Sequence, residues 1–132
     1  MKVKRVNEVE STKAPSAYFT GTAFINALVK NENESNTILS VTFAPGSRNY
    51  WHAHPGGQVL ICTYGKGYVQ KRGEHIQEIF PGDVVTIDPG EVHWHGAAPD
   101  SIFTHIAVNP HIPGKEETEW LEEVTSAEYH SK

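Results

Sequence analysis

Short runs of β-branched and aromatic residues alternate with turn signals over most of the chain. Runs of this kind, bounded by Pro-Gly and other glycine-containing turns, are typical of β-strands. The pattern predicts strands at Tyr18–Val29, Thr37–Phe43, Val59–Tyr64, Tyr68–Arg72, Ile76–Phe80, Val84–Ile87 and Ile102–Val108, with a polar loop at Asn31–Asn36. Strands at roughly ten-residue spacing indicate an all-β antiparallel sandwich or barrel.

The last part of the chain has a different period. The turn at Pro113-Gly114 ends the strand pattern, and Trp120, Leu121 and Val124 follow at helical spacing. This spacing predicts a short C-terminal amphipathic helix over Glu116–Tyr129 that packs its Trp120 side on the barrel. No composition shift or repeat marks a second domain, so we predict a single domain over residues 1–132.

Composition and charge exclude several classes of partner. The 132 residues are 38% hydrophobic and 20% charged, with 16 acidic against 11 basic residues and a formal net charge of -5. That balance leaves no basic surface for nucleic acid or anionic lipid. No apolar run approaches the length of about eighteen residues that a membrane span needs. The segment from Met1 to Glu10 lacks the apolar region of a signal peptide, so we expect a cytoplasmic protein.

Two His-x-His pairs and one glutamine carry the candidate chemistry. The side chains of His52 and His54 share one face of a strand because they are two residues apart, and the same holds for His93 and His95. Gln58 follows the first pair after a Pro-Gly-Gly turn, which would place its strand beside that pair. Imidazole nitrogens and one amide oxygen that converge on one point suit Mn, Fe, Co, Ni or Zn. Because Gln58 is uncharged, the metal would keep its +2 charge, which favours Lewis-acid chemistry.

His105 is the candidate base. By parity with Phe103 and Ala107 it faces the interior of a late strand, where a neutral imidazole can accept a proton at pH 7. The alternative for His105 is a core histidine that a neighbour satisfies, and for His95 a strand histidine without a chemical role. A barrel with polar interior groups and no metal is the alternative for the ligand set. Three aromatic side chains are also expected to line the pocket: Phe19, Phe43 and Tyr50.

The two His-containing segments resemble the two sequence motifs of the cupin superfamily. The first motif matches at Gly46, His52, His54 and Gly65, with Gln58 at the position of a glutamate. The second matches at Gly82, Gly90 and His93, while Asp88 and Ala97 stand where a proline and an asparagine are expected. The resemblance spans about residues 37–108. It implies a cupin double-stranded β-helix (a jelly-roll barrel), commonly a homodimer or homotetramer, with metal ligands at His52, His54, Gln58 and His93.

A narrower resemblance is to the bacterial manganese-dependent hydroxynitrile lyases of cupin fold. The residues that carry it are Gln58, the run Pro81–Pro99, the Thr104-His105 pair and the Tyr18–Gly21 segment. It implies one Mn(II) per chain, with Fe(II) next and Zn(II), Ni(II) or Co(II) as further candidates. It implies C–C bond cleavage or formation on a small hydroxyl or carbonyl compound. It also implies that His105 moves the proton and that His95 lines the pocket.

Two other functions stay open at this point. Three histidines and a weak fourth ligand on Fe(II) suit a dioxygenase that binds a substrate and dioxygen together, and oxygen dependence separates this function from a lyase. A small barrel of this kind also suits a non-catalytic module that binds a small ligand. Fold alone does not choose among the three.

Overall fold

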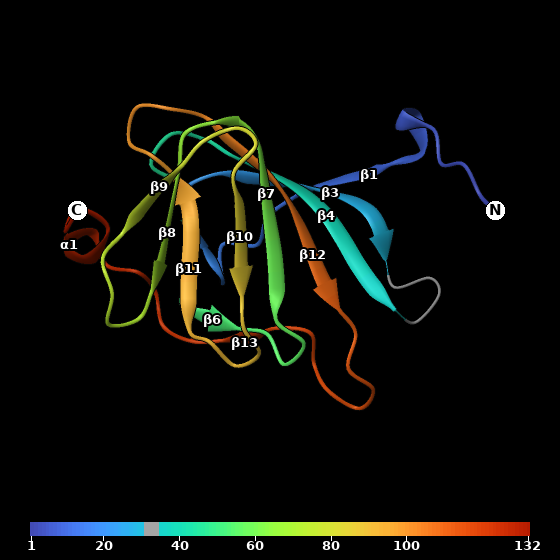
Figure 1. Ribbon diagram of the computed structural model, residues 1–132. Coiled ribbons are helices and arrows are strands. Elements are labelled where there is room, and N and C mark those ends of the chain that lie inside the picture. The colour runs from blue at the N-terminus through green and yellow to red at the C-terminus, as the bar shows by residue number, and fades with distance from the viewer. Residues whose placement is uncertain (31–34) are drawn as a thin grey trace.

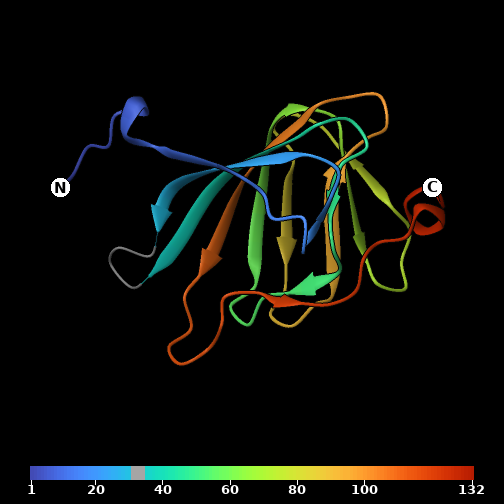
Figure 2. The ribbon, with the colours of Figure 1, turned by 180° about the vertical axis from the view of Figure 1, so that it is seen from behind.

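Antiparallel strands in two sheets form most of the molecule (Figure 1). The structure, a computed structural model, describes residues 1–30 and 35–132. The two sheets enclose the interior between them, and Figure 2 shows the same arrangement from behind. The all-β prediction is confirmed. Of the loop predicted at Asn31–Asn36, the first four residues lie outside the described residues.

The strand order accounts for both walls of the barrel. The first sheet has the order β1 (Glu10–Lys13), β3 (Ala23–Lys30), β4 (Asn36–Phe43), β12 (Phe103–Pro110), β7 (Gln58–Gly65) and β10 (Val84–Ile87). The second has the order β13 (Glu119–Trp120), β6 (His52–Ala53), β11 (His93–Ala97), β5 (Arg48–Asn49) and β2 (Phe19–Thr20). At its side, β8 (Gly67–Lys71) pairs with β11 and with β9 (Gln77–Ile79).

Alternation along the strands decides which side chains reach the interior. On β12, buried and half-buried residues alternate, so that His105 and Asn109 point inward together with Phe103 and Ala107. On β7, Gln58 is buried in the same alternating pattern. Period-two patterning of this kind marks strands with one face on a core. Polar side chains on the inner face therefore share the interior with the apolar core.

The predicted strand Tyr18–Val29 is two strands that lie in different sheets. It breaks at Gly21, whose φ of 84° is a left-handed conformation that favours glycine. A Cβ atom at Gly21 would lie 2.3 Å from Ser47 Oγ, so a side chain has no room there. The break directs β2 into the second sheet and β3 into the first.

The C-terminal helix is much shorter than predicted. It covers only Ser126–Tyr129, whereas Glu119–Trp120 forms β13 and pairs with β6. The prediction of a helix over the earlier part of Glu116–Tyr129 is therefore wrong, because strand pairing with an open edge outweighs local spacing. The helix begins after Thr125, whose side chain accepts from the Glu128 N–H in a capping box. No helix among the described residues is long and apolar enough to cross a membrane.

A second apolar cluster fastens the C-terminal segment to the outside of the barrel. Trp94 and Tyr129 are buried in it, and the Tyr129 hydroxyl donates to the Ala97 carbonyl at 2.6 Å. Arg48 Nη2 donates to the Val124 carbonyl at 3.0 Å, and its guanidinium lies 4.5 Å from the centre of the Tyr129 ring. These contacts hold the segment that leads away from β13.

Candidate functional site

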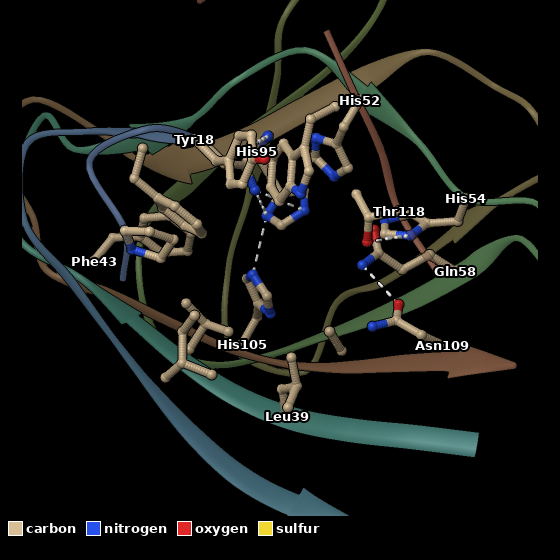
Figure 3. Close-up of a pocket in the computed structure, with 17 residues that line it drawn as sticks. Tyr18, Leu39, Phe43, His52, His54, Gln58, His95, His105, Asn109 and Thr118 are labelled. Atoms are coloured by element: carbon tan, nitrogen blue, oxygen red, sulfur yellow. Dashed lines mark hydrogen bonds between the residues drawn. The ribbon is translucent and has the colours of Figure 1, made fainter. Parts of the chain in front are cut away.

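A cavity of about 320 Å³ opens between the two sheets. Its volume is near the lower end of the roughly 300–1,000 Å³ typical of small-molecule sites. Figure 3 shows that histidines occupy one part of it and apolar side chains another. The main apolar lining residues are Phe19, Ile25, Leu39, Val41, Phe43 and Trp120. None of the described residues that line the cavity is a carboxylate.

Three histidines are held in the same way, each through its Nδ1 atom. The Nδ1 atom of His52 lies 2.7 Å from the Tyr50 carbonyl oxygen, that of His54 lies 3.0 Å from the Glu117 carbonyl, and that of His93 lies 2.9 Å from the Glu91 carbonyl. A carbonyl oxygen only accepts, so each Nδ1 carries the proton and donates. Each Nε2 is then left with a lone pair, the form in which histidine binds a metal.

Strand pairing and one tight turn bring these side chains together. On neighbouring strands β6 and β11, His52 is the register partner of His93. Between His54 and Gln58 the chain turns at Gly57, whose φ is 74° and whose N–H donates to the His54 carbonyl at 3.0 Å. A Cβ at Gly57 would lie 2.8 Å from the Ile87 carbonyl oxygen, so glycine is required by both conformation and space.

The inward-facing atoms of this group fit a divalent cation. Gln58 Oε1 lies 3.0 Å from His93 Nε2, and neither atom carries a proton when His93 donates through Nδ1. The Nε2 atom of His54 is buried and has no hydrogen-bond partner among the described residues. Buried lone pairs that face each other are unfavourable unless a positive group lies between them. The donor set of imidazole nitrogens and an amide oxygen matches a first-row transition metal.

A second possible set of three ligand nitrogens shares two histidines with the group of His52, His54 and His93. The nitrogens of His52, His93 and His95 all lie within 4.8 Å of one another, and all three residues are buried. Proximity alone would favour this set, with His95 in place of His54. However, Asn49 and His105 contact the His95 ring nitrogens, whereas His54 Nε2 has no hydrogen-bond partner among the described residues. A buried three-histidine group that can hold a metal is thus present, and the hydrogen bonds favour His54 over His95 as its member.

His95 and His105 form a hydrogen-bonded pair beside this group. His105 Nε2 lies 3.0 Å from His95 Nδ1 (Figure 3). Asn49 lies next to the pair: its Oδ1 accepts from the His95 backbone N–H at 2.9 Å, which directs its amide nitrogen to the His95 ring, 3.2 Å from Nε2. The pairing of β12 with β7 shifts register between Thr104 and His105. Such irregularities often re-aim a side chain beside a site.

Burial keeps the cavity histidines neutral. It lowers the pKa of His93 to about 4 and that of His105 to about 3, from an ordinary value of 6.5. Burial also lowers the pKa of His54, and it holds the pKa values of His52 and His95 well below the ordinary range, with repulsion from neighbouring histidines as a further cause. Neutral imidazoles are the form that binds metals and accepts protons.

The structure places all six predicted site residues around this one cavity, with His93 beside its lining residues. Phe19 and Phe43, which are expected from the sequence to line the pocket, are among the lining residues. Tyr50 is not among the lining residues, and its hydroxyl donates to Glu123 at 3.2 Å instead.

Among the lining residues that sequence reasoning missed, three contact the predicted site residues or close the cavity. Trp120 stacks on Tyr18 with ring centres 4.6 Å apart, instead of packing a helix. Asn109 accepts from Gln58 Nε2 at 2.9 Å, and Asn49 contacts His95. Only Asn109 had a signal in the sequence, because it has the same strand parity as His105.

The geometry and the sequence together identify the family. The family model of the cupin domain matches residues 39–108. The chain belongs to the cupin family. This confirms the resemblance seen in the two His-containing motifs, and it accounts for the barrel with histidines on its inner face.

Individual relatives narrow this further. The chain is 46% identical over 130 residues to an (R)-mandelonitrile lyase of Granulicella tundricola, covering 98% of both proteins. A crystal structure of a cupin-like protein from Thermotoga maritima is similar with a TM-score of 0.86 and 44% identity, covering 91% of each chain. A predicted oxalate decarboxylase from the same organism has a TM-score of 0.74 at 22% identity, covers 84% of this chain and 100% of its own, and shows the fold alone.

Proposed function

We propose that this cupin is a metal-dependent lyase that breaks or forms the C–C bond between cyanide and a small aldehyde, as in the cleavage of mandelonitrile. The observation that carries the proposal is the cavity, where metal-competent histidines, a neutral histidine pair and an apolar wall face one space. The 46% identity over nearly the full length to an (R)-mandelonitrile lyase supports it.

We assign His52, His54, Gln58 and His93 as the ligands of one divalent metal per chain. The support is the common Nδ1 hydrogen bonding of the three histidines and the inward Gln58 oxygen. When bound, the metal supplies Lewis-acid polarisation of the substrate oxygen. Because no ligand in this set is anionic, the metal charge is not reduced by the protein.

The metal we expect is Mn(II), with Fe(II) next and Zn(II), Ni(II) or Co(II) as other candidates for the same ligands. The likeness of the Gln58-containing motif to the manganese-dependent lyases supports this order. A homodimer or homotetramer and a cytoplasmic location stay predictions from the sequence. Metal analysis of the purified protein identifies the metal, and its mass in solution gives the oligomeric state.

We assign proton transfer to His105, with His95 as its partner. Two neutral imidazoles carry two protons, one of which lies in the hydrogen bond between His105 Nε2 and His95 Nδ1. The other proton is on His105 Nδ1 when His95 Nε2 accepts from the Asn49 amide, and it is on His95 Nε2 when His105 Nδ1 offers the lone pair. A shift of the shared proton lets the pair accept at one end and donate at the other. His105 Nδ1 is buried without a partner among the described residues, so it is free for a substrate group.

The proposed reaction balances within the cavity. The histidine pair takes the proton from the cyanohydrin hydroxyl as the carbonyl forms. The bond between the former hydroxyl carbon and the nitrile carbon breaks, and its electron pair leaves with cyanide. The pair then returns the proton to give hydrogen cyanide. Burial weakens the pair as a base, but negative charge that develops on the nearby oxygen raises its pKa as the proton moves.

The apolar wall holds the rest of the substrate. Phe19, Phe43 and Trp120 present aromatic surface to the cavity, and Leu39 and Val41 complete it from β4. Such a wall binds an aryl or alkyl group and excludes water, which would otherwise compete for the histidine pair. It also provides no charge to bind an ionised substrate, which favours a neutral cyanohydrin or aldehyde.

Release of benzaldehyde from mandelonitrile tests the proposal. Protein freed of metal and reloaded with Mn(II) or Fe(II) would be assayed with and without oxygen. We expect metal-dependent release without oxygen, and its loss in the His52→Ala and His105→Ala variants. The exposed His75 provides a matched control, since His75→Ala leaves the cavity intact.

Three outcomes would contradict the proposal. No release under any condition by metal-loaded protein excludes cleavage of this substrate. Metal-dependent turnover that requires oxygen points to an Fe(II)-dependent dioxygenase instead. A protein that binds metal and a small ligand but does not turn it over, and whose binding is the same in His105→Ala, is a non-catalytic binding protein.

A further inference from the structure

The Gln58 carboxamide lies between a histidine and an asparagine, with its two ends in different surroundings. Its Oε1 is 3.0 Å from His93 Nε2, on the side of the histidine group. Its Nε2 donates to Asn109 Oδ1 at 2.9 Å, away from that group (Figure 3). Gln58 and Asn109 are each only 5% exposed, so both ends depend on protein partners.

The two ends of a carboxamide have the same shape but opposite chemistry. The oxygen accepts and can bind a cation, whereas the NH2 group only donates and cannot. A reversed Gln58 would set its oxygen against the Asn109 oxygen and turn N–H groups toward the histidines. The hydrogen-bond acceptor of the Gln58 NH2 group therefore decides which end of the carboxamide faces the histidines.

We propose that Asn109 is a positioning residue that sets the orientation of Gln58 and so makes it an oxygen ligand. This proposal rests on the assignment of Gln58 as a metal ligand. Asn109 is on β12, on the same inner face as His105, whereas Gln58 begins β7. The pairing of these two strands thus brings the acceptor to the ligand.

The surroundings of Asn109 agree with this role. Since its oxygen accepts from Gln58, its own amide nitrogen must face elsewhere. The Glu117 side chain lies near: burial raises the pKa of its carboxyl group, and hydrogen bonds from Thr37 and Asn109 act against that rise. Only the amide nitrogen can donate such a bond. Both neighbours therefore require the same orientation of the Asn109 amide.

The test measures Mn(II) binding to two metal-free proteins, the unsubstituted protein and Asn109→Leu. The leucine side chain has a shape similar to that of asparagine but no hydrogen-bond acceptor. We expect the Mn(II) dissociation constant to rise about 10- to 100-fold, as for other residues that orient a ligand. Asn109→Asp keeps an acceptor oxygen for Gln58 but loses the donor to Glu117, so it should bind Mn(II) more tightly than Asn109→Leu. Asn26→Leu, on β3 outside the cavity lining, is the matched control and should bind normally.

A double substitution separates orientation from packing. In Gln58→Glu both ends of the side chain are oxygen, so there is no orientation to lose. Adding Asn109→Leu to Gln58→Glu should therefore leave the Mn(II) dissociation constant within about twofold. An equal loss of affinity in both backgrounds would mean that Asn109 acts only by packing, and the proposal would be overturned. Thermal unfolding checks that each variant folds. If Asn109→Leu does not fold, Asn109→Ala takes its place in the comparison.

The outcome is independent of the reaction assigned above. Protein that binds Mn(II) but does not cleave mandelonitrile would contradict the lyase function alone, and the affinities would still decide the role of Asn109. Failure of the unsubstituted protein to bind Mn(II), Fe(II) or Zn(II) would contradict the ligand assignment and with it the role of Asn109. Normal Mn(II) affinity in Asn109→Leu would overturn the positioning role alone.

Discussion

The Nε2 atom of His105 lies 3.0 Å from the Nδ1 atom of His95, and both rings are buried. The two residues come from different sheets, since His105 is on β12 and His95 is on β11. The pair to which we assign proton transfer thus lies beside the histidines assigned to the metal. Because backbone carbonyls hold those three histidines independently of the pair, a substitution in the pair should leave them in place.

The first prediction concerns His105. His105→Ala should lower the rate of mandelonitrile cleavage by about 10²- to 10⁴-fold, the usual contribution of a general base. Its Mn(II) content should not change, because the three backbone-anchored histidines remain. Steady-state kinetics and metal analysis of the same sample measure both. Thr104→Ala, on the opposite face of β12, is the control, and loss of metal in His105→Ala would contradict the separation of roles.

The second prediction concerns metal and stability. Mn(II) that binds only the folded chain stabilises it, by about 2.7 kcal/mol at a free concentration one hundred times the dissociation constant. We therefore expect the Tm of the metal-free protein to rise on addition of Mn(II) and to fall again with chelator. His52→Ala should show no such rise, whereas His75→Ala should behave as the unsubstituted protein. A rise in His52→Ala of the same size would mean that Mn(II) binds elsewhere.

The third prediction concerns pH. Folding lowers the pKa of His105 to about 3 and that of His93 to about 4 from 6.5, so below pH 6.5 the unfolded chain binds more protons than the folded one. Stability is thus full above pH 6.5 and decreases as the pH falls toward these values. The slope is about 1.4 kcal/mol per pH unit for each histidine that is neutral only when folded. The Tm of metal-free protein at pH 7, 6 and 5 should fall steadily, and less steeply in His105→Gln. A Tm that does not change over this range would contradict the buried neutral state.

The fourth prediction concerns the mouth of the cavity. Tyr18 stacks on Trp120, and the two rings line both the cavity and a second hollow that Glu116 and Glu117 also line. Removing the phenol ring in Tyr18→Ala widens this opening. We expect the kcat/KM for a bulky aryl cyanohydrin to rise about tenfold relative to mandelonitrile. Tyr18→Phe keeps the ring and should keep the ratio, and an unchanged ratio in Tyr18→Ala would place the entrance elsewhere.

Local pattern was sufficient for the parts of the site that depend on strand parity. The pairs His52/His54 and His93/His95 point inward because residues two apart on a strand share a face. The turn before Gln58 requires glycine at position 57, because a residue with a side chain does not fit there. The strand Val84–Ile87 likewise has the bounds that its sequence predicts, because a turn signal stands at each end.

Other features depended on contacts between distant segments, which parity does not specify. Trp120, Leu121 and Val124 have helical spacing, yet Trp120 joins a sheet because it pairs with the edge of β6. Asn109 has the right parity, but its role exists only because Gln58 approaches it from β7.

The sequence by itself therefore determined the all-β fold, the cupin motifs and the inward direction of the site histidines, since each is set by residues close together in the chain. Only the tertiary structure decided that His54 rather than His95 has a buried nitrogen without a partner in the described part of the chain, and that His95 contacts His105. The physical reason is that a histidine's role depends on what its second ring nitrogen contacts. That contact is supplied by carbonyls and side chains from other strands.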